Sequence, residues 1–173
     1  MQTKKIKTKK LTFLSLLVGY SLILYIIETY IPNPLIAIFP GAKLGLSNIV
    51  TLIALLTLGF KETLIVLSVR ILMSSIFAGP ISYLLFSISG GYLSLVAMYF
   101  FSKFEFSTIS VSIIGAISHN IGQVLMASII ILNMNMFSYL PFILFTSIIT
   151  GVFVGFSVKF TLNKFNTTFF INY

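Results

Sequence analysis

The sequence has no cysteine, no aspartate and no tryptophan, and only 8% of its 173 residues are charged. Without cysteine the chain can form no disulfide, no thiolate metal site and no nucleophilic thiol. The acidic residues are Glu28, Glu62 and Glu105 alone, which excludes catalytic schemes that depend on aspartate-rich motifs. A single histidine without Asp or Cys cannot supply a usual metal ligand set. We therefore expect no metal, no other cofactor and no enzymatic activity.

What the chain does have is a large apolar content. Apolar residues make up 58% of it and charged residues only 8%, whereas about 25% of the residues of a soluble domain are normally charged. The formal net charge of +8 comes from basic residues at the ends of apolar runs, where lipid headgroups and membrane topology explain them better than nucleic acid does. The composition predicts an all-α integral membrane protein that does not bind nucleic acid.

Apolar runs of about 17 to 25 residues are long enough to cross the hydrocarbon layer as helices. The first run is read as a retained helix rather than a signal peptide, because it is long and lacks a small-x-small cleavage site. We predict a basic tail at residues 1–10, a transmembrane domain at 11–165 and a second tail at 166–173. The six predicted spans are Leu11–Thr29, Leu44–Phe60, Thr63–Ala78, Ile81–Phe101, Thr108–Leu132 and Leu140–Leu162.

The lysines predict the orientation of these spans, since cytoplasmic loops carry an excess of basic residues. Six spans with a cytoplasmic amino terminus leave only Lys43 outside and also place the carboxyl terminus in the cytoplasm. A model with four spans would instead place Lys61, Glu62 and Arg70 on the outer side of the membrane. The lysines predicted to be cytoplasmic are Lys4, Lys5, Lys7, Lys9, Lys10, Lys61, Lys103, Lys159 and Lys164.

The longest predicted connection is the outer loop at residues 30–43, which contains three of the five prolines. Proline and glycine forbid a continuous helix here, while the loop also contains several apolar residues. It is predicted to be either a lid or an interfacial linker. In the lid interpretation, Pro40, Gly41 and Lys43 close over a ligand.

Arg70 is an ionisable residue about seven positions into the third predicted span. A charge at such a depth costs roughly 2.5–3.5 kcal/mol on insertion scales unless it is paired or hydrated. Two partners satisfy this requirement: an anionic group of a ligand, or Glu28 near the outer end of the first span. The sequence leaves both open.

A second polar group lies in the fifth predicted span, where His119, Asn120 and Gln123 fall within five residues. Gly115, His119, Gly122 and Gln123 recur at helical spacing and share one face. The small residues on this face allow a helix or a ligand to approach. The two interpretations are a ligand-lining site and hydrogen bonding between helices.

Other polar and small residues complete the set of predicted site and packing positions. Asn48 opens the second span, and the pair Gly90-Gly91 in the fourth either unwinds the helix or permits close packing. Gly151 and Gly155 form a GxxxG pattern, with a weaker small-xxx-small pattern at Ser15 and Gly19. Both patterns predict helix contact, within the fold or with a partner subunit.

Taken together, the run Pro40–Asn48, Arg70, Ser89-Gly90-Gly91 and the segment from Gly115 to Gln123 resemble the Gx transporter family. That family is also labelled heptaprenyl diphosphate synthase component I and is similar to the S components of energy-coupling factor (ECF) transporters. The resemblance implies a bacterial six-helix protein of the cell membrane that captures a vitamin-like solute from outside. It also implies partners, namely a transmembrane coupling subunit and two ATPases. In that setting Asn48, Arg70, His119, Asn120 and Gln123 contact the solute.

The synthase label is tested by the residues present. Prenyl synthases hold magnesium with aspartate-rich motifs, and this chain has no Asp. It also lacks a Walker motif, so ATP hydrolysis must occur elsewhere. The sequence therefore favours a solute-binding subunit, with a non-catalytic membrane partner in prenyl diphosphate or menaquinone synthesis as the alternative. A self-contained channel or carrier is a third hypothesis, and the sequence does not identify the solute.

Overall fold

The computed structural model describes residues 2–31, 45–77 and 81–164. Within these ranges the chain is helical and contains no strand, which confirms the all-α prediction. The predicted lid residues Pro40, Gly41 and Lys43, and the tail at 166–173, lie outside the described residues. The helices are α1 (Gln2–Tyr30), α3 (Asn48–Leu58), α4 (Phe60–Phe77), α5 (Ile81–Ser102), α6 (Thr108–Ile131), the short 3₁₀ helix η1 (Met134–Tyr139) and α7 (Leu140–Lys164).

Four helical stretches among the described residues are long and apolar enough to cross a membrane. They are Thr8–Glu28, Leu84–Ser102, Thr108–Ile131 and Met134–Lys164. Large apolar side chains such as Ile76, Ile129 and Phe145 are exposed on the outside of the bundle, as expected where lipid rather than water is the solvent. The chain is therefore a membrane-embedded helical protein.

The second predicted span is shorter in the structure than the sequence indicated. Gly45 has a positive φ of 85°, a conformation that an α-helix cannot contain, so α3 begins only at Asn48. With 11 residues it is about 16 Å long, too short to cross a hydrocarbon layer of about 30 Å by itself. Six complete spans therefore remain a prediction.

The boundary between the second and third predicted spans also differs from the prediction. Gly59, with a φ of 88°, is the one residue between α3 and α4. The helix α4 begins at Phe60 instead of Thr63, so Lys61 and Glu62 lie in its first turn. The sequence placed these two charges in a loop because they interrupt the apolar run, although a first turn accommodates an acidic residue well.

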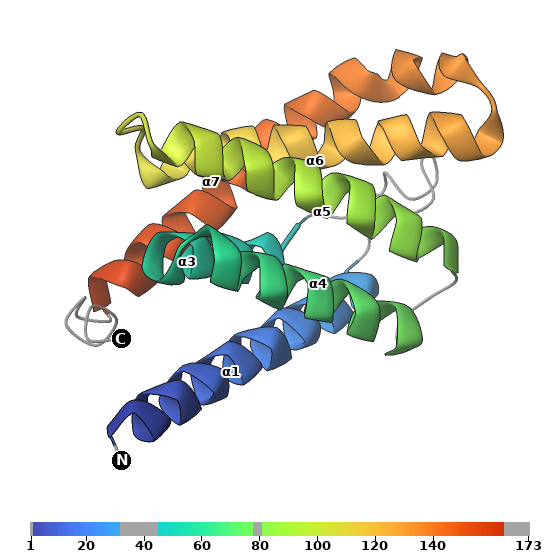
Figure 1. Cartoon of the computed structure of the whole chain (residues 1–173). Coiled ribbons are helices and arrows are strands. Elements are labelled where there is room, and N and C mark those ends of the chain that lie inside the picture. Colours follow the sequence, from blue (N-terminus) through green and yellow to red (C-terminus); the bar gives the residue numbers. More distant parts are fainter. Residues whose placement is uncertain (1, 32–44, 78–80, 165–173) are drawn as a thin grey trace.

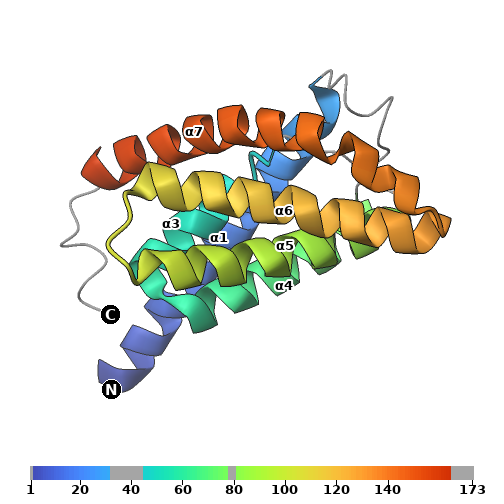
Figure 2. The same cartoon turned by 90° about the horizontal axis from the view of Figure 1, so that it is seen from above.

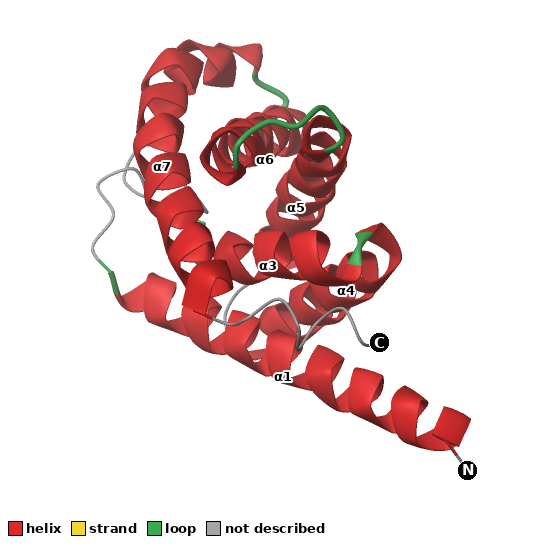
Figure 3. Ribbon diagram, turned by 90° about the vertical axis from the view of Figure 1, so that its left-hand side faces the viewer, coloured by secondary structure: helices red, strands yellow, loops and turns green. Residues whose placement is uncertain are grey.

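The helices run between two opposite ends of the bundle. The start of α1, the end of α7, the turn between α3 and α4 and the connection between α5 and α6 lie at one end, and the connection from α6 to α7 lies at the other (Figures 1 and 2). Seen end on, α6 is flanked by α5 and α7, while α1 packs against α4 and α3 (Figure 3). Successive helices thus alternate in direction, as the predicted topology requires.

Basic residues gather at the end of the bundle where α1 begins and α7 ends. Lys10 of α1 forms an ion pair with Glu62 of α4, and this hydrogen bond holds the pKa of Glu62 below its ordinary value. The ammonium of Lys103 lies 4.4 Å from the ring centroid of Tyr99. By the positive-inside rule this end is predicted to be cytoplasmic.

Candidate functional site

Arg70 lies in the middle of α4, ten residues after its first residue, and is only 3% exposed. It shares an inward face with Leu67 and Ser74, which are also buried. A Cβ atom at Gly91 of α5 would lie 3.8 Å from Arg70 Nη2, so the guanidinium packs directly on α5. Its Nη1 atom has no hydrogen-bond partner among the described residues.

The buried carboxylate that interacts with Arg70 comes from α1. Glu28 is 5% exposed and interacts electrostatically with Arg70. Its Oε1 accepts a hydrogen bond from the backbone N–H of Gly45. Of the two partners that the sequence left open for Arg70, Glu28 is buried within range of an electrostatic interaction, and its hydrogen bond with Gly45 fixes the chain just before α3.

Tyr25 joins the same group from the next turn of α1. Its hydroxyl shares hydrogen bonds with Ser74 of α4 and Ser87 of α5 and interacts electrostatically with Arg70. Ser21, Tyr25 and Glu28 are all buried and recur at helical spacing, so one stripe of α1 is polar and inward-facing. Three helices are thus joined by polar contacts in the interior of the bundle.

His119 and Gln123 approach α5 from the opposite side. A Cβ at Gly90 would lie 3.1 Å from His119 Cε1 and 3.0 Å from Gln123 Cγ. Gly122 packs on the same helix, where its carbonyl accepts a hydrogen bond of 2.6 Å from the Ser89 hydroxyl. The predicted shared face of α6 therefore points inward, and the approaching element is a helix, α5.

The consecutive glycines of α5 bring these groups to one level of the bundle. His119 and Gln123 contact α5 at Gly90, and Arg70 contacts it at the next residue, Gly91. We call this set the polar layer. Its members are Tyr25, Glu28, Arg70, Ser74, Ser87, His119 and Gln123.

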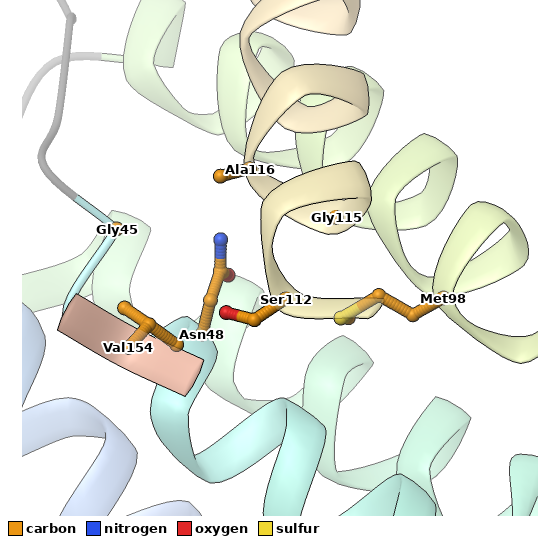
Figure 4. Close-up of a pocket in the computed structure, with 7 residues that line it drawn as sticks. All are labelled: Gly45, Asn48, Met98, Ser112, Gly115, Ala116 and Val154. Atoms are coloured by element: carbon orange, nitrogen blue, oxygen red, sulfur yellow. The ribbon is translucent and has the colours of Figure 1, made fainter. Parts of the chain in front are cut away.

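Asn120 and Asn48, the remaining predicted ligand contacts, lie outside the polar layer. The Asn120 side chain donates a hydrogen bond of 2.6 Å to the Ser147 hydroxyl of α7, as the helix-bridging interpretation anticipates. Asn48 instead lines a cavity of about 10 Å³ between α3, α5, α6 and α7 (Figure 4). A role in solute binding remains a prediction for all five residues.

The small residues predicted for helix contacts divide into two groups. A Cβ at Gly151 would lie 2.6 Å from Ile113 Cα, and one at Gly155 would lie 2.7 Å from Ile109 Cα, so the GxxxG pattern joins α7 to α6 within the fold. Gly19 has nothing within 4 Å of its Cβ position. Together with the exposed Ser15, it leaves one face of α1 accessible.

Sequence reasoning missed Tyr25, Ser74 and Ser147. The first two stand one helical turn from charged residues that were singled out: Tyr25 precedes Glu28 by three positions and Ser74 follows Arg70 by four. Residues at this spacing share a helix face. A search for hydroxyls one turn from each intramembrane charge would have found them.

Fold and site together define a polytopic membrane protein whose ionisable interior residues lie in one layer. The sequence matches the family described as heptaprenyl diphosphate synthase component I over residues 17–161. The chain belongs to this family. No curated protein and no solved structure matches the chain.

Proposed function

We propose that this protein is the solute-binding membrane subunit, or S component, of an ECF-type importer for a vitamin-like small molecule. The observation that carries the proposal is the polar layer. Buried Arg70 and Glu28, with His119 and Gln123 across α5, represent a large insertion cost, and such residues usually mark a substrate path. The proposal locates the protein in a bacterial cell membrane with both termini in the cytoplasm.

Within this proposal the layer supplies both charge and hydrogen bonds to the solute. Arg70 attracts an anionic group through Nη1, which has no hydrogen-bond partner among the described residues. His119 and Gln123 donate and accept hydrogen bonds. Because these side chains pack tightly against the glycine pair of α5, solute binding requires α5 or α6 to shift.

The proposed partners are a transmembrane coupling subunit and two ATPases, which supply the energy that this chain cannot. The accessible face of α1 offers a contact surface for the coupling subunit. Gly19 has open space at its Cβ position. The Ser15 hydroxyl donates a hydrogen bond of 3.0 Å to the Leu11 carbonyl of its own helix. A second membrane helix can therefore approach this stripe closely.

The wording of the family description suggests a second candidate, a non-catalytic membrane partner in prenyl diphosphate or menaquinone synthesis. Affinity purification of the tagged chain from its native membranes, with mass spectrometry of the bound proteins, separates the two. The importer proposal expects a coupling subunit and ATPases. Stable recovery of a soluble prenyl synthase without them would replace the proposal with the second candidate.

A further inference from the structure

The cavity beside Asn48 is a site that the proposed function does not use. It lies at the buried start of α3 and is lined by Gly45, Asn48, Met98, Ser112, Gly115, Ala116 and Val154. Figure 4 shows the Asn48 amide and the Ser112 hydroxyl directed into the same space from α3 and α6. Two helices that are distant in the sequence therefore present polar groups to one small volume.

The polar atoms around this volume are incompletely satisfied. Ser112 Oγ is fully buried and has no hydrogen-bond partner among the described residues, and the same holds for Ser94 Oγ. Ser94 Oγ lies 3.3 Å from the Cβ position of Gly115, which is one of the lining residues. An unsatisfied buried hydroxyl costs about 1–3 kcal/mol, so these groups favour any small ligand that can both donate and accept hydrogen bonds.

The size of the cavity identifies that ligand. A cavity of about 10 Å³ is at the lower limit for holding one water molecule, and a buried water typically makes two to four hydrogen bonds. We propose that this cavity binds a single water molecule, which joins the start of α3 to α6 through Asn48 and Ser112. The water supplies hydrogen bonds to polar groups at the buried start of α3, where bulk solvent is absent inside the membrane.

Met98 provides a direct readout of this water. Its sulfur lies 2.6 Å from the Cβ position of Gly115, and the side chain is only 2% exposed. Hydroxyl radicals formed by X-ray radiolysis of bound water oxidise adjacent side chains, and methionine sulfur oxidises readily. The purified protein in detergent should therefore show oxidation of Met98 despite its burial, with exposed Met134 as the internal reference.

Two variants and one control test the assignment by mass spectrometry of the oxidised peptides. Ser112→Ala removes a hydrogen-bond partner, and Val154→Ile fills part of the cavity. Each should lower the oxidation rate of Met98, relative to Met134, at least about threefold if a bound water is the source. Ser21→Ala removes an equally buried hydroxyl that has no partner among the described residues and lies outside the cavity, and it should leave that rate unchanged.

Two results would overturn the proposal. One is a Met98 that stays unoxidised in the native chain, which would mean a dry cavity. The other is equal oxidation in the native chain, Ser112→Ala and Val154→Ile. Ser112→Ala adds no volume, so it remains informative even if Val154→Ile fails to fold.

Discussion

At the scale of single residues, the described part of the chain has one buried guanidinium and one buried carboxylate. Arg70 and Glu28 come from α4 and α1 and attract each other in a low-dielectric environment. Removing one member of such a pair leaves the other as an uncompensated buried charge, whereas removing both does not. The stability of this region therefore depends on both residues.

We predict strong coupling between these two residues. Glu28→Gln or Arg70→Gln alone should lower the free energy of unfolding by about 3–5 kcal/mol. The double variant should lose clearly less than the sum of the two single losses. The free energies of unfolding of the two single variants and the double variant are measured in mild detergent by titration with a denaturing detergent. Strictly additive losses would show that the two charges act independently.

At the scale of the helices, close contacts at small residues and the hydrogen bond from the Ser89 hydroxyl to the Gly122 carbonyl hold α5 against α6. A Cβ at Gly122 would lie 2.7 Å from the Ser89 carbonyl oxygen and 2.9 Å from Gly90 Cα. These are backbone atoms, which cannot move aside as a flexible side chain can. The spacing between α5 and α6, and with it the position of His119 and Gln123, depends on glycine at this site.

Gly122→Ala is expected to destabilise the protein by about 1–3 kcal/mol, because the two helices must separate to admit the methyl group. Gly19→Ala is the matched control, since it is also helical but has nothing within 4 Å of its Cβ position. The control should be neutral or slightly stabilising. Thermal unfolding of both variants in the same detergent tests this, and equal losses would argue against close packing as the role of Gly122.

The helices also show what the sequence could and could not predict. The 3.6-residue period correctly placed Gly115, His119 and Gln123 on one inward face, because that period depends only on local geometry. The late start of α3 was missed, since the positive φ of Gly45 leaves no trace in an apolar run. The partner of Arg70 could not be chosen, because contacts between helices are set by tertiary packing rather than by spacing.

At the scale of the whole molecule, the predicted topology requires the two ends of the bundle to face opposite sides of a membrane. Glu105 lies in the connection between α5 and α6, and Leu132, which is 91% exposed, follows α6 at the other end. Because the chain has no cysteine, a single cysteine introduced at either position can be labelled without a background.

We expect Leu132→Cys to react with a membrane-impermeant thiol reagent in intact cells. Glu105→Cys should react only after the membrane is opened, because positive-inside topology places its lysine-bearing loop in the cytoplasm. A denatured sample of each variant controls for reactivity. Labelling of both positions from the same side would contradict the alternating path of the helices.

Native mass spectrometry of the protein extracted in mild detergent shows whether the polar layer binds a small solute. The native chain should retain a small molecule as an added mass. Arg70→Ala and His119→Ala should each weaken its binding at least about tenfold, equivalent to about 1.4 kcal/mol. Gly19→Ala, away from the layer, should retain it. A bound mass that is unaffected by both layer variants, or a native chain that never carries one, would show that the polar layer does not bind a solute.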